Sequence, residues 1–156
     1  MLGSDVTIRE VKSTDAPYIT QLMTEIGFPS NPQQMRNRLL KIERDPTFRT
    51  FVCEVSGLIV GMIGIRVGCS YHTDGVDAHI LVLVVHPKFR RRGIGKLLVG
   101  AAEKWATRQG ANRIFMTSQI DEATAVEFAE KKNYLRSGQR FTKQVEPPSP
   151  GRPLNQ

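Results

Sequence analysis

The stretch between residues 80 and 105 constrains the fold of this chain more than any other. It begins with an apolar run, Ile80–Val85, that predicts a buried strand, and His86-Pro87 ends this strand because proline cannot donate a ladder hydrogen bond. A basic turn with two glycines follows at Arg90–Lys96. Apolar residues then recur at helical spacing through Trp105, which predicts a helix. A strand, a glycine turn and a helix in this order indicate an α/β fold.

The turn is suited to binding an anion. The first N–H groups of a helix have no partner within the helix, and the helix macrodipole adds partial positive charge at the same end. Gly93 and Gly95 lack the side chains that would keep a phosphate away from the backbone. One residue separates these glycines, which does not fit the Walker pattern. Leu98 stands where the dinucleotide-binding pattern has its third glycine.

The remaining pattern, Arg-x-x-Gly-x-Gly at Arg90–Gly95, comes directly after a strand that ends Leu83–Pro87. This combination resembles the acyl-CoA signature of the GNAT superfamily of N-acetyltransferases. The resemblance covers roughly residues 6–145 and is closest to the branch that acetylates small amines, including the aminoalkylphosphonate and aminoglycoside 6′-N-acetyltransferase types. The other interpretation is a tight strand-to-helix turn with a solvated arginine run. Three further stretches carry the resemblance: Val60–Gly64, Glu103–Ala106 and Arg140–Lys143.

The order of the predicted elements is β-α-α-β-β-β-α-β-α-β, which is similar to the GNAT order. We expect an α/β chain with a mixed, mostly antiparallel central sheet of about six strands flanked by four helices. Residues 1–145 are expected to form one N-acetyltransferase domain and residues 146–156 a proline-rich tail. The predicted strands are Val6–Val11, Thr50–Val55, Leu58–Val67, Ile80–Val85, Arg113–Ser118 and Gln139–Val145. The predicted helices run from Ser13 to Gly27, Asn31 to Asp45, Leu97 to Gln109 and Asp121 to Lys132.

Three local signals refine this order. Ser56-Gly57 between two apolar runs predicts a two-residue hairpin turn. Gly61 and Gly64, inside a predicted strand, indicate a bulge or a close approach of another backbone. The polar segment Gly68–Asp77 predicts a loop.

The charge balance favours anionic partners. The 156 residues carry 22 basic and 15 acidic side chains, a formal net charge of +7. Such a chain attracts nucleic acid, an acidic surface or a polyphosphate cofactor. A nucleic-acid surface at Arg90–Arg92 is the less favoured of these, because it requires neither the two glycines nor the buried strand. Cys53 and Cys69 form no disulfide framework, and no signal peptide or membrane span is evident, so we expect a cytoplasmic protein.

The resemblance implies acetyl-CoA as co-substrate and the primary amine of a small molecule as acceptor, which attacks directly in a ternary complex. It implies that the strand end meets the pantetheine arm, that the turn N–H groups hold the pyrophosphate, and that the N–H of Val85 or Val84 polarises the thioester carbonyl. A homodimer is a further expectation, because relatives are often dimers. The resemblance assigns the following residues to the cofactor: Leu83, Val84, Val85, Arg90, Arg91, Arg92, Gly93, Ile94, Gly95, Lys96 and Phe128.

The sequence departs from its relatives at the groups that move protons. Many relatives carry a glutamate as base on the strand that here reads His79–Leu83, and this strand has no carboxylate. His79 is the candidate base, since its ordinary pKa of about 6.5 suits that role, although a lone histidine at a strand entrance can also be inert. Ala129 stands where relatives carry a tyrosine near the CoA sulfur, and Tyr134 is expected to pack in the core.

These departures keep two alternatives open. One is a catalytically weak GNAT protein that binds acyl-CoA as a sensor or interaction module. The other is an acetyltransferase for protein N-termini or lysines. The acceptor site has only loose candidates, which are Phe28 and Asn31 between the first two helices and Tyr71 and His72 in the polar loop. A metal site is not expected, because the histidines and cysteines show no ligand spacing.

Overall fold

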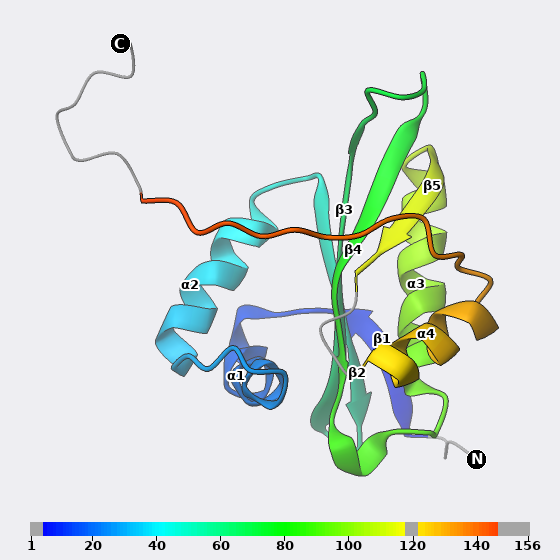
Figure 1. The fold of residues 1–156 in the computed structure, drawn as a ribbon. Coiled ribbons are helices and arrows are strands. Elements are labelled where there is room, and N and C mark those ends of the chain that lie inside the picture. The colour runs from blue at the N-terminus through cyan, green and yellow to red at the C-terminus, as the bar shows by residue number, and fades with distance from the viewer. Residues whose placement is uncertain (1–4, 118–121, 147–156) are drawn as a thin grey trace, which may run out of the picture.

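The computed structural model of the chain describes residues 5–117 and 122–146, so Ser118, Asp121 and the tail from 147 onward, on which parts of the predicted elements fall, lie outside the described residues. The described chain forms one five-stranded sheet in the order β1-β2-β3-β4-β5 (Figure 1). Neighbouring strands are antiparallel except β4 and β5, which are parallel. The strands are β1 (Val6–Glu10), β2 (Phe48–Val55), β3 (Leu58–Cys69), β4 (Val76–Val85) and β5 (Ala111–Met116).

Helices cover both faces of this sheet. The four helices are α1 (Ala16–Glu25), α2 (Pro32–Glu43), α3 (Ile94–Arg108) and α4 (Glu122–Lys131), and two short 3₁₀ turns are η1 (Ser13–Asp15) and η2 (Pro87–Phe89). Figure 1 shows α1 and α2 on one side of the sheet and α3 and α4 on the other. No helix among the described residues is long and apolar enough to cross a membrane.

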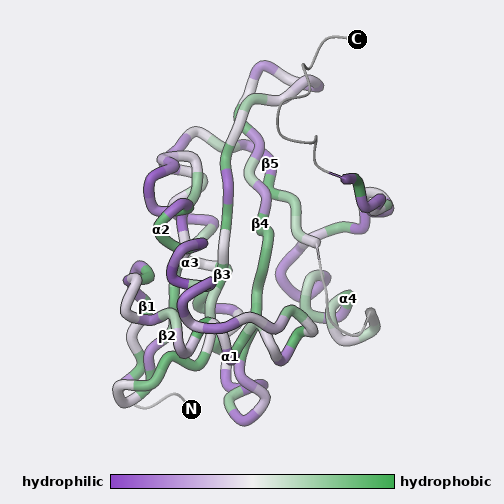
Figure 2. Tube along the Cα trace, turned by 90° about the vertical axis from the view of Figure 1, so that its left-hand side faces the viewer, coloured by the Kyte–Doolittle hydropathy of each residue, from purple (hydrophilic) through white to green (hydrophobic). Residues whose placement is uncertain are grey.

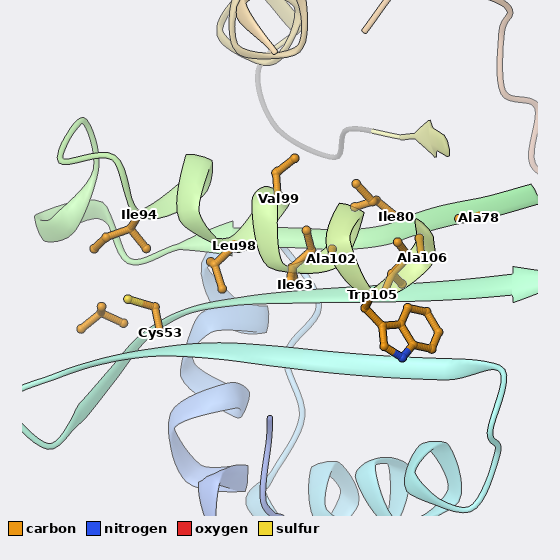
Figure 3. Close-up of a cluster of buried hydrophobic side chains, with 12 residues drawn as sticks. Cys53, Ile63, Ala78, Ile80, Ile94, Leu98, Val99, Ala102, Trp105 and Ala106 are labelled. Atoms are coloured by element: carbon orange, nitrogen blue, oxygen red, sulfur yellow. The ribbon is translucent and has the colours of Figure 1, made fainter. Parts of the chain in front are cut away.

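Each layer of helices has its own buried core. The core under α3 contains Leu98, Ala102 and Trp105 on the helix, packed on the sheet residues Ile63 and Ile80 (Figure 3). The core on the opposite face joins α1 and α2 to the sheet, and its members are Ala16, Ile19, Leu22, Met35, Leu39, Val52, Ile59, Met62 and Val84. Burial of these side chains stabilises the sheet on both faces.

The mixed, mostly antiparallel sheet and the four helices are confirmed. The predicted hairpin is also confirmed, because Ser56 and Gly57 join β2 to β3 with positive φ angles of 49° and 83°. This is the backbone that a two-residue turn needs to match the twist of its strands.

The sixth strand, predicted at Gln139–Val145, is wrong. These described residues form no strand, and Phe141 and Val145 are 87% and 77% exposed. A short segment makes a strand only when a neighbouring edge pairs with it and a core receives its apolar side chains. Neither condition is met by this segment.

The predicted loop Gly68–Asp77 is too long. The ladder between β3 and β4 continues through Gly68↔Asp77 and Cys69↔Val76. The prediction took the polar residues of this segment as a sign of a loop. Asp77 is nevertheless buried in β4, and its carboxylate accepts two hydrogen bonds from Arg113 on β5, at 3.0 Å each. A charged residue that is paired in this way can lie inside a ladder.

A buried ion pair holds the start of the chain. Asp15, at the end of η1, accepts two hydrogen bonds from the Arg9 guanidinium at 2.8 and 2.9 Å and one from the Lys12 N–H at 2.8 Å. Arg9 also donates to Glu54 on β2. Burial raises the pKa of Asp15, but its hydrogen bonds with Arg9 and Lys12 outweigh burial and leave the pKa below its ordinary value. A carboxyl group whose pKa is lowered by folding stabilises the fold above its unfolded pKa and loses that effect as the pH falls.

We predict that Asp15→Asn lowers the free energy of unfolding by about 2–3 kcal/mol near pH 7, because the half-buried Arg9 guanidinium loses the carboxylate that accepts two of its hydrogen bonds and keeps only that of Glu54. The deficit should begin to narrow below about pH 4, where Asp15 of the unfolded chain takes up a proton, and should disappear only below the lowered pKa of the folded protein, so the second measurement is made as far below pH 4 as the fold persists. Urea unfolding at both pH values measures this difference. Asp74→Asn, in the exposed β3–β4 turn, is the control. An equal deficit at both pH values would contradict the assignment.

Candidate functional site

The sheet opens where β4 and β5 diverge. The parallel pairs between them run from Val76↔Ala111 to Ile80↔Met116. β4 then continues through Leu81–Val85, and no described strand pairs with it on the β5 side. Backbone groups that lack a partner in a sheet must bind water or a ligand.

The register decides which groups of β4 face this opening. The His86 N–H donates to the Val60 carbonyl at 2.7 Å, which makes His86 and Val60 a hydrogen-bonded pair of the β3–β4 ladder. Such pairs alternate, so the N–H of Val84 faces β3, whereas the N–H groups of Leu83 and Val85 face the opening. We call residues 81–85, seen from this side, the free edge of β4.

A bulge begins the free edge. The partners of β4 on β3 shift from Gly64↔Val82 to Ile65↔Ile80, so Leu81 is an extra residue in β4. This confirms the bulge predicted from the glycines of β3. Gly64 leaves room for it, because a Cβ atom on Gly64 would lie 3.1 Å from a methyl group of Val82.

The glycine turn presents a row of N–H groups next to the free edge. Arg91 and Gly93 have positive φ angles of 61° and 83°, and Gly93 is the N-cap of α3. Within the described part of the chain, no backbone N–H from Arg91 to Lys96 donates a hydrogen bond, and the first bond of α3 runs from Leu97 to the Gly93 carbonyl. This is the arrangement that binds phosphate at helix N-termini.

Basic side chains surround this turn and fix its shape. The Arg90 Nε donates to the Val85 carbonyl at 3.0 Å, which ties the turn to the free edge and leaves the Val85 N–H available. The Arg92 guanidinium lies over the Phe89 ring, 5.2 Å from its centroid. Arg91 and Lys96 are exposed. The turn therefore concentrates positive charge beside unpaired N–H groups.

Two glycines allow close packing around the start of α3: Gly61 lets α3 approach the sheet, and Gly95 lets α4 approach α3. A Cβ atom on Gly61 would lie 3.1 Å from Leu98 and 3.2 Å from the Val84 carbonyl oxygen, so Gly61 is the predicted close approach. A Cβ atom on Gly95 would lie 3.2 Å from the Phe128 ring of α4. Phe128 thus packs on the turn at the start of α3, and Gly95 has a packing role in addition to exposing its N–H.

His79 lies just before β4 and β5 diverge. It is exposed, and its ring stacks on Phe115 of β5 with 4.9 Å between ring centroids and 23° between planes. Its neighbours Ala78 and Ile80 are buried in the core under α3, so His79 projects from the opposite face of the sheet. The structure therefore places His79 near the opening but not on the face that carries α3.

The structure assigns the other candidates to packing or to the surface. Tyr134 packs against the core under α3, where burial raises the pKa of its phenol to about 12, and its hydroxyl has no hydrogen-bond partner among the described residues. Asn31 caps α2 by accepting the Gln34 N–H at 2.8 Å. Tyr71 is fully exposed. Across residues 5–117 and 122–146, no group of His, Cys, Asp or Glu side chains is arranged to hold a metal.

Sequence reasoning missed a cavity at the end of the free edge. An open cavity of ≈ 270 Å³ lies between α1 and the residue that follows β4. It holds Glu25 and His86, whose Nδ1 accepts the Lys88 N–H at 3.2 Å. Only the tertiary packing of α1 against the sheet brings these residues together, so no local pattern could have indicated them. The lining residues are Thr20, Gln21, Thr24, Glu25 and His86.

Comparisons with known proteins agree with this geometry. Residues 16–134 match the sequence model of the acetyltransferase (GNAT) family. The aminoalkylphosphonate N-acetyltransferase of Salmonella typhimurium is 31% identical over 99 residues, which span 64% of this chain and 64% of the relative. An uncharacterized N-acetyltransferase of Chlorobaculum tepidum is 30% identical over 117 residues, which span 74% of this chain and 70% of that protein. The chain thus matches less than two thirds of the length of the Salmonella relative.

Solved structures share the fold at lower identity. An aminoglycoside N-acetyltransferase in complex with CoA superposes with a TM-score of 0.79 at 16% identity, covering 92% of this chain and 96% of that one. Glucosamine-6-phosphate N-acetyltransferase from Arabidopsis thaliana has a TM-score of 0.79 at 18% identity, covering 90% and 99%. At this level of identity the likeness concerns the fold.

The close packing of Gly95 generates a prediction. Gly100→Ala should raise the free energy of unfolding by about 0.5–1 kcal/mol, because this exposed glycine of α3 has open space where the Cβ would lie. Gly95→Ala gains the same helix propensity but must displace Phe128, so it should be less stable than Gly100→Ala by about 1 kcal/mol or more. Thermal unfolding of both variants, and of Gly95→Ala with Phe128→Leu, measures the difference. Equal stabilities would show that Phe128 does not press on Gly95.

Proposed function

We propose that this chain, which belongs to the GNAT acetyltransferase family, transfers the acetyl group of acetyl-CoA to the primary amine of a small molecule. The observation that carries the proposal is the continuity between the free edge of β4 and the N–H groups of the turn at Arg91–Lys96. CoA has amide groups along its pantetheine arm and a pyrophosphate where that arm ends. It therefore complements the free edge of β4 and the turn at the same time.

The residues present fit this cofactor. The N–H groups of Leu83 and Val85 face the opening and suit carbonyl oxygens of the pantetheine arm and of the thioester that the arm carries. The N–H groups from Arg91 to Lys96 suit the pyrophosphate, and the exposed Arg91 and Lys96 side chains add positive charge. Phe128, packed on Gly95, forms the wall of the turn on the side of α4.

Acetyl-CoA supplies an acetyl thioester, whose carbonyl becomes more negative as an amine attacks it. A backbone N–H directed at that oxygen stabilises the developing charge. The register excludes Val84 from this role, because its N–H is turned toward Met62 of β3, and it leaves Val85 and Leu83. We propose that Val85, next to the turn, binds the arm and that Leu83, nearer to His79, polarises the thioester carbonyl. Arg90 holds the Val85 carbonyl, which belongs to the peptide between Val85 and His86, and thereby fixes the end of the free edge.

Proton transfer relies on few side chains. His79, stacked on Phe115 where the strands diverge, is our candidate to accept the proton of the attacking amine. Ala129 offers no hydroxyl to the leaving thiolate, and the Tyr134 hydroxyl is buried in the core under α3. A thiol of pKa about 8.5 leaves without strong acid assistance, so we propose that water supplies this proton and that turnover is slow.

The small-amine acceptor is supported by the relatives. One curated relative is named for aminoalkylphosphonates, and a solved neighbour is named for aminoglycosides. A panel of polyamines, aminoglycosides, aminoalkylphosphonates, amino acids and lysine peptides, followed by thiol release from acetyl-CoA, separates this proposal from a protein acetyltransferase and from a binder without turnover.

Binding of CoA should depend on Gly93. We predict that Gly93→Val raises the Kd for CoA at least tenfold, because a side chain there stands between the N–H groups and the pyrophosphate. Gly57→Val is a matched control, since Gly57 has the same φ angle of 83° and lies in the β2–β3 turn with open space around it. Calorimetry on both folded variants measures the effect. An unchanged Kd in Gly93→Val would remove the turn from the cofactor site.

The role of His79 is tested by its rate and its pH profile. His79→Ala should lower kcat by about 10²-fold and remove the ionisation of the base from the pH–rate profile, since general-base catalysis contributes about this much. His72→Ala, in the exposed β3–β4 turn, should leave both unchanged. A His79→Ala protein with the wild-type rate and profile would make this histidine structural.

A further inference from the structure

Four side chains form one row across four strands of the sheet. The Cα partners are Phe48↔Arg66 between β2 and β3, Arg66↔His79 between β3 and β4, and His79↔Phe115 between β4 and β5. Residues directly opposite each other in a ladder project from the same face. We call Phe48, Arg66, His79 and Phe115 the cross-strand row.

The row lies on the part of the sheet that the helices leave uncovered. It shares the face of α1 and α2, because the residues flanking His79 are buried under α3 on the other face. Figure 2 looks onto this face, and the upper parts of β4 and β5 carry no helix in front of them. Arg66 and His79 are both exposed.

Aromatic rings hold the polar groups of the row in place. The Arg66 guanidinium lies over the Phe48 ring, 5.7 Å from its centroid. The His79 ring stacks on Phe115, and the Arg113 guanidinium lies over the same Phe115 ring at 5.2 Å. A guanidinium that rests on a ring keeps its N–H groups available and loses less conformational freedom when it binds an anion.

The guanidinium of Arg66 has no ion-pair partner among the described residues. Arg113 forms a two-bond ion pair with Asp77, which neutralises that guanidinium. In the ranges that the structure describes, Arg66 forms no ion pair. The Asp45 carboxylate lies close enough to feel its charge, but that carboxylate accepts hydrogen bonds from Thr47.

The row also lies next to the opening of the sheet. His79↔Phe115 is the pair before the last one that joins β4 to β5, and the bulge at Leu81 follows two residues later. At about 3.3 Å per residue, the free edge at Leu83 is roughly 13 Å from His79 along the strand, and the bulge is about half as far. One small molecule can therefore reach both Arg66 and the opening.

We propose that the cross-strand row binds the acceptor and selects amines that also carry an anionic group, with the anion on Arg66 and the amine on the side of His79 and the bulge. This inference rests on the proposed acetyltransferase activity. Carboxylates and phosphonates both match the planar, two-pronged geometry of a guanidinium. A neutral amine of the same length uses only the reacting end of the site.

Matched acceptors test this selection: the phosphonate 3-aminopropylphosphonate, the carboxylate 4-aminobutyrate and the neutral alcohol 3-aminopropanol. In Arg66→Gln, the KM for the phosphonate should rise about tenfold, and the KM for the carboxylate should rise in the same direction, because both lose a charge-assisted contact. The KM for the neutral alcohol should change less than twofold, and Arg66→Lys should recover part of the loss. Arg108→Gln, an exposed charge on α3 across the sheet, is the control and should behave as wild type. The difference between the two anions shows which group the site prefers.

The outcomes separate this inference from the activity on which it rests. If Arg66→Gln acetylates the amine of 3-aminopropanol at the wild-type rate, the acetyltransferase activity itself is intact. Equal changes in KM for the anionic and the neutral acceptors, or equal effects of Arg66→Gln and Arg108→Gln, would overturn the role of Arg66. If CoA binds but no amine is acetylated, the role of Arg66 is tested by binding. Calorimetry then measures the Kd of 3-aminopropylphosphonate for the CoA-loaded wild type and Arg66→Gln. Binding that Arg66→Gln leaves unchanged, or no binding to wild type, would also overturn it.

Discussion

The structure depends on a strand that is longer than its partner. β4 pairs with β3 along its whole length but leaves β5 after Ile80, so no strand in the described part of the chain pairs with the other side of the backbone from Leu81 to Val85. Unpaired backbone groups inside a sheet carry a free-energy cost unless something binds them. Water can do so, but a ligand with amide groups does it in one geometry. The opening is therefore both a weakness of the sheet and the reason that it can hold an extended cofactor.

The surrounding sequence keeps this opening in shape. Gly61 and Gly64 let α3 approach the sheet and accommodate the bulge, and Arg90 ties the turn back to the Val85 carbonyl. Gly93 turns the chain into α3 with its N–H groups exposed beside the free edge. Because α3 also supplies much of the core through Leu98 and other apolar residues, its packing on the sheet anchors the turn that precedes it.

The sequence predicted those elements that depend only on residues close together in the chain. The strand at residues 80–85, the turn with Gly93, the hairpin at Ser56-Gly57 and the bulge near Gly64 all follow from residue types at short range. The cross-strand row could not be predicted, because it needs the register of four strands. The strand expected at residues 139–145 failed for a related reason, since its own residues carry no information about whether the edge of a sheet pairs with it.

The central claim is that the free edge and the turn bind one cofactor together. Backbone amide resonances measured during a titration with CoA test it most directly. We expect the largest shifts, and slower amide exchange, at Leu83, Val85 and Gly93–Lys96, with Val84 protected before CoA is added because its N–H already bonds β3. Shifts confined to the turn, with Leu83 and Val85 unaffected at saturation, would contradict the account.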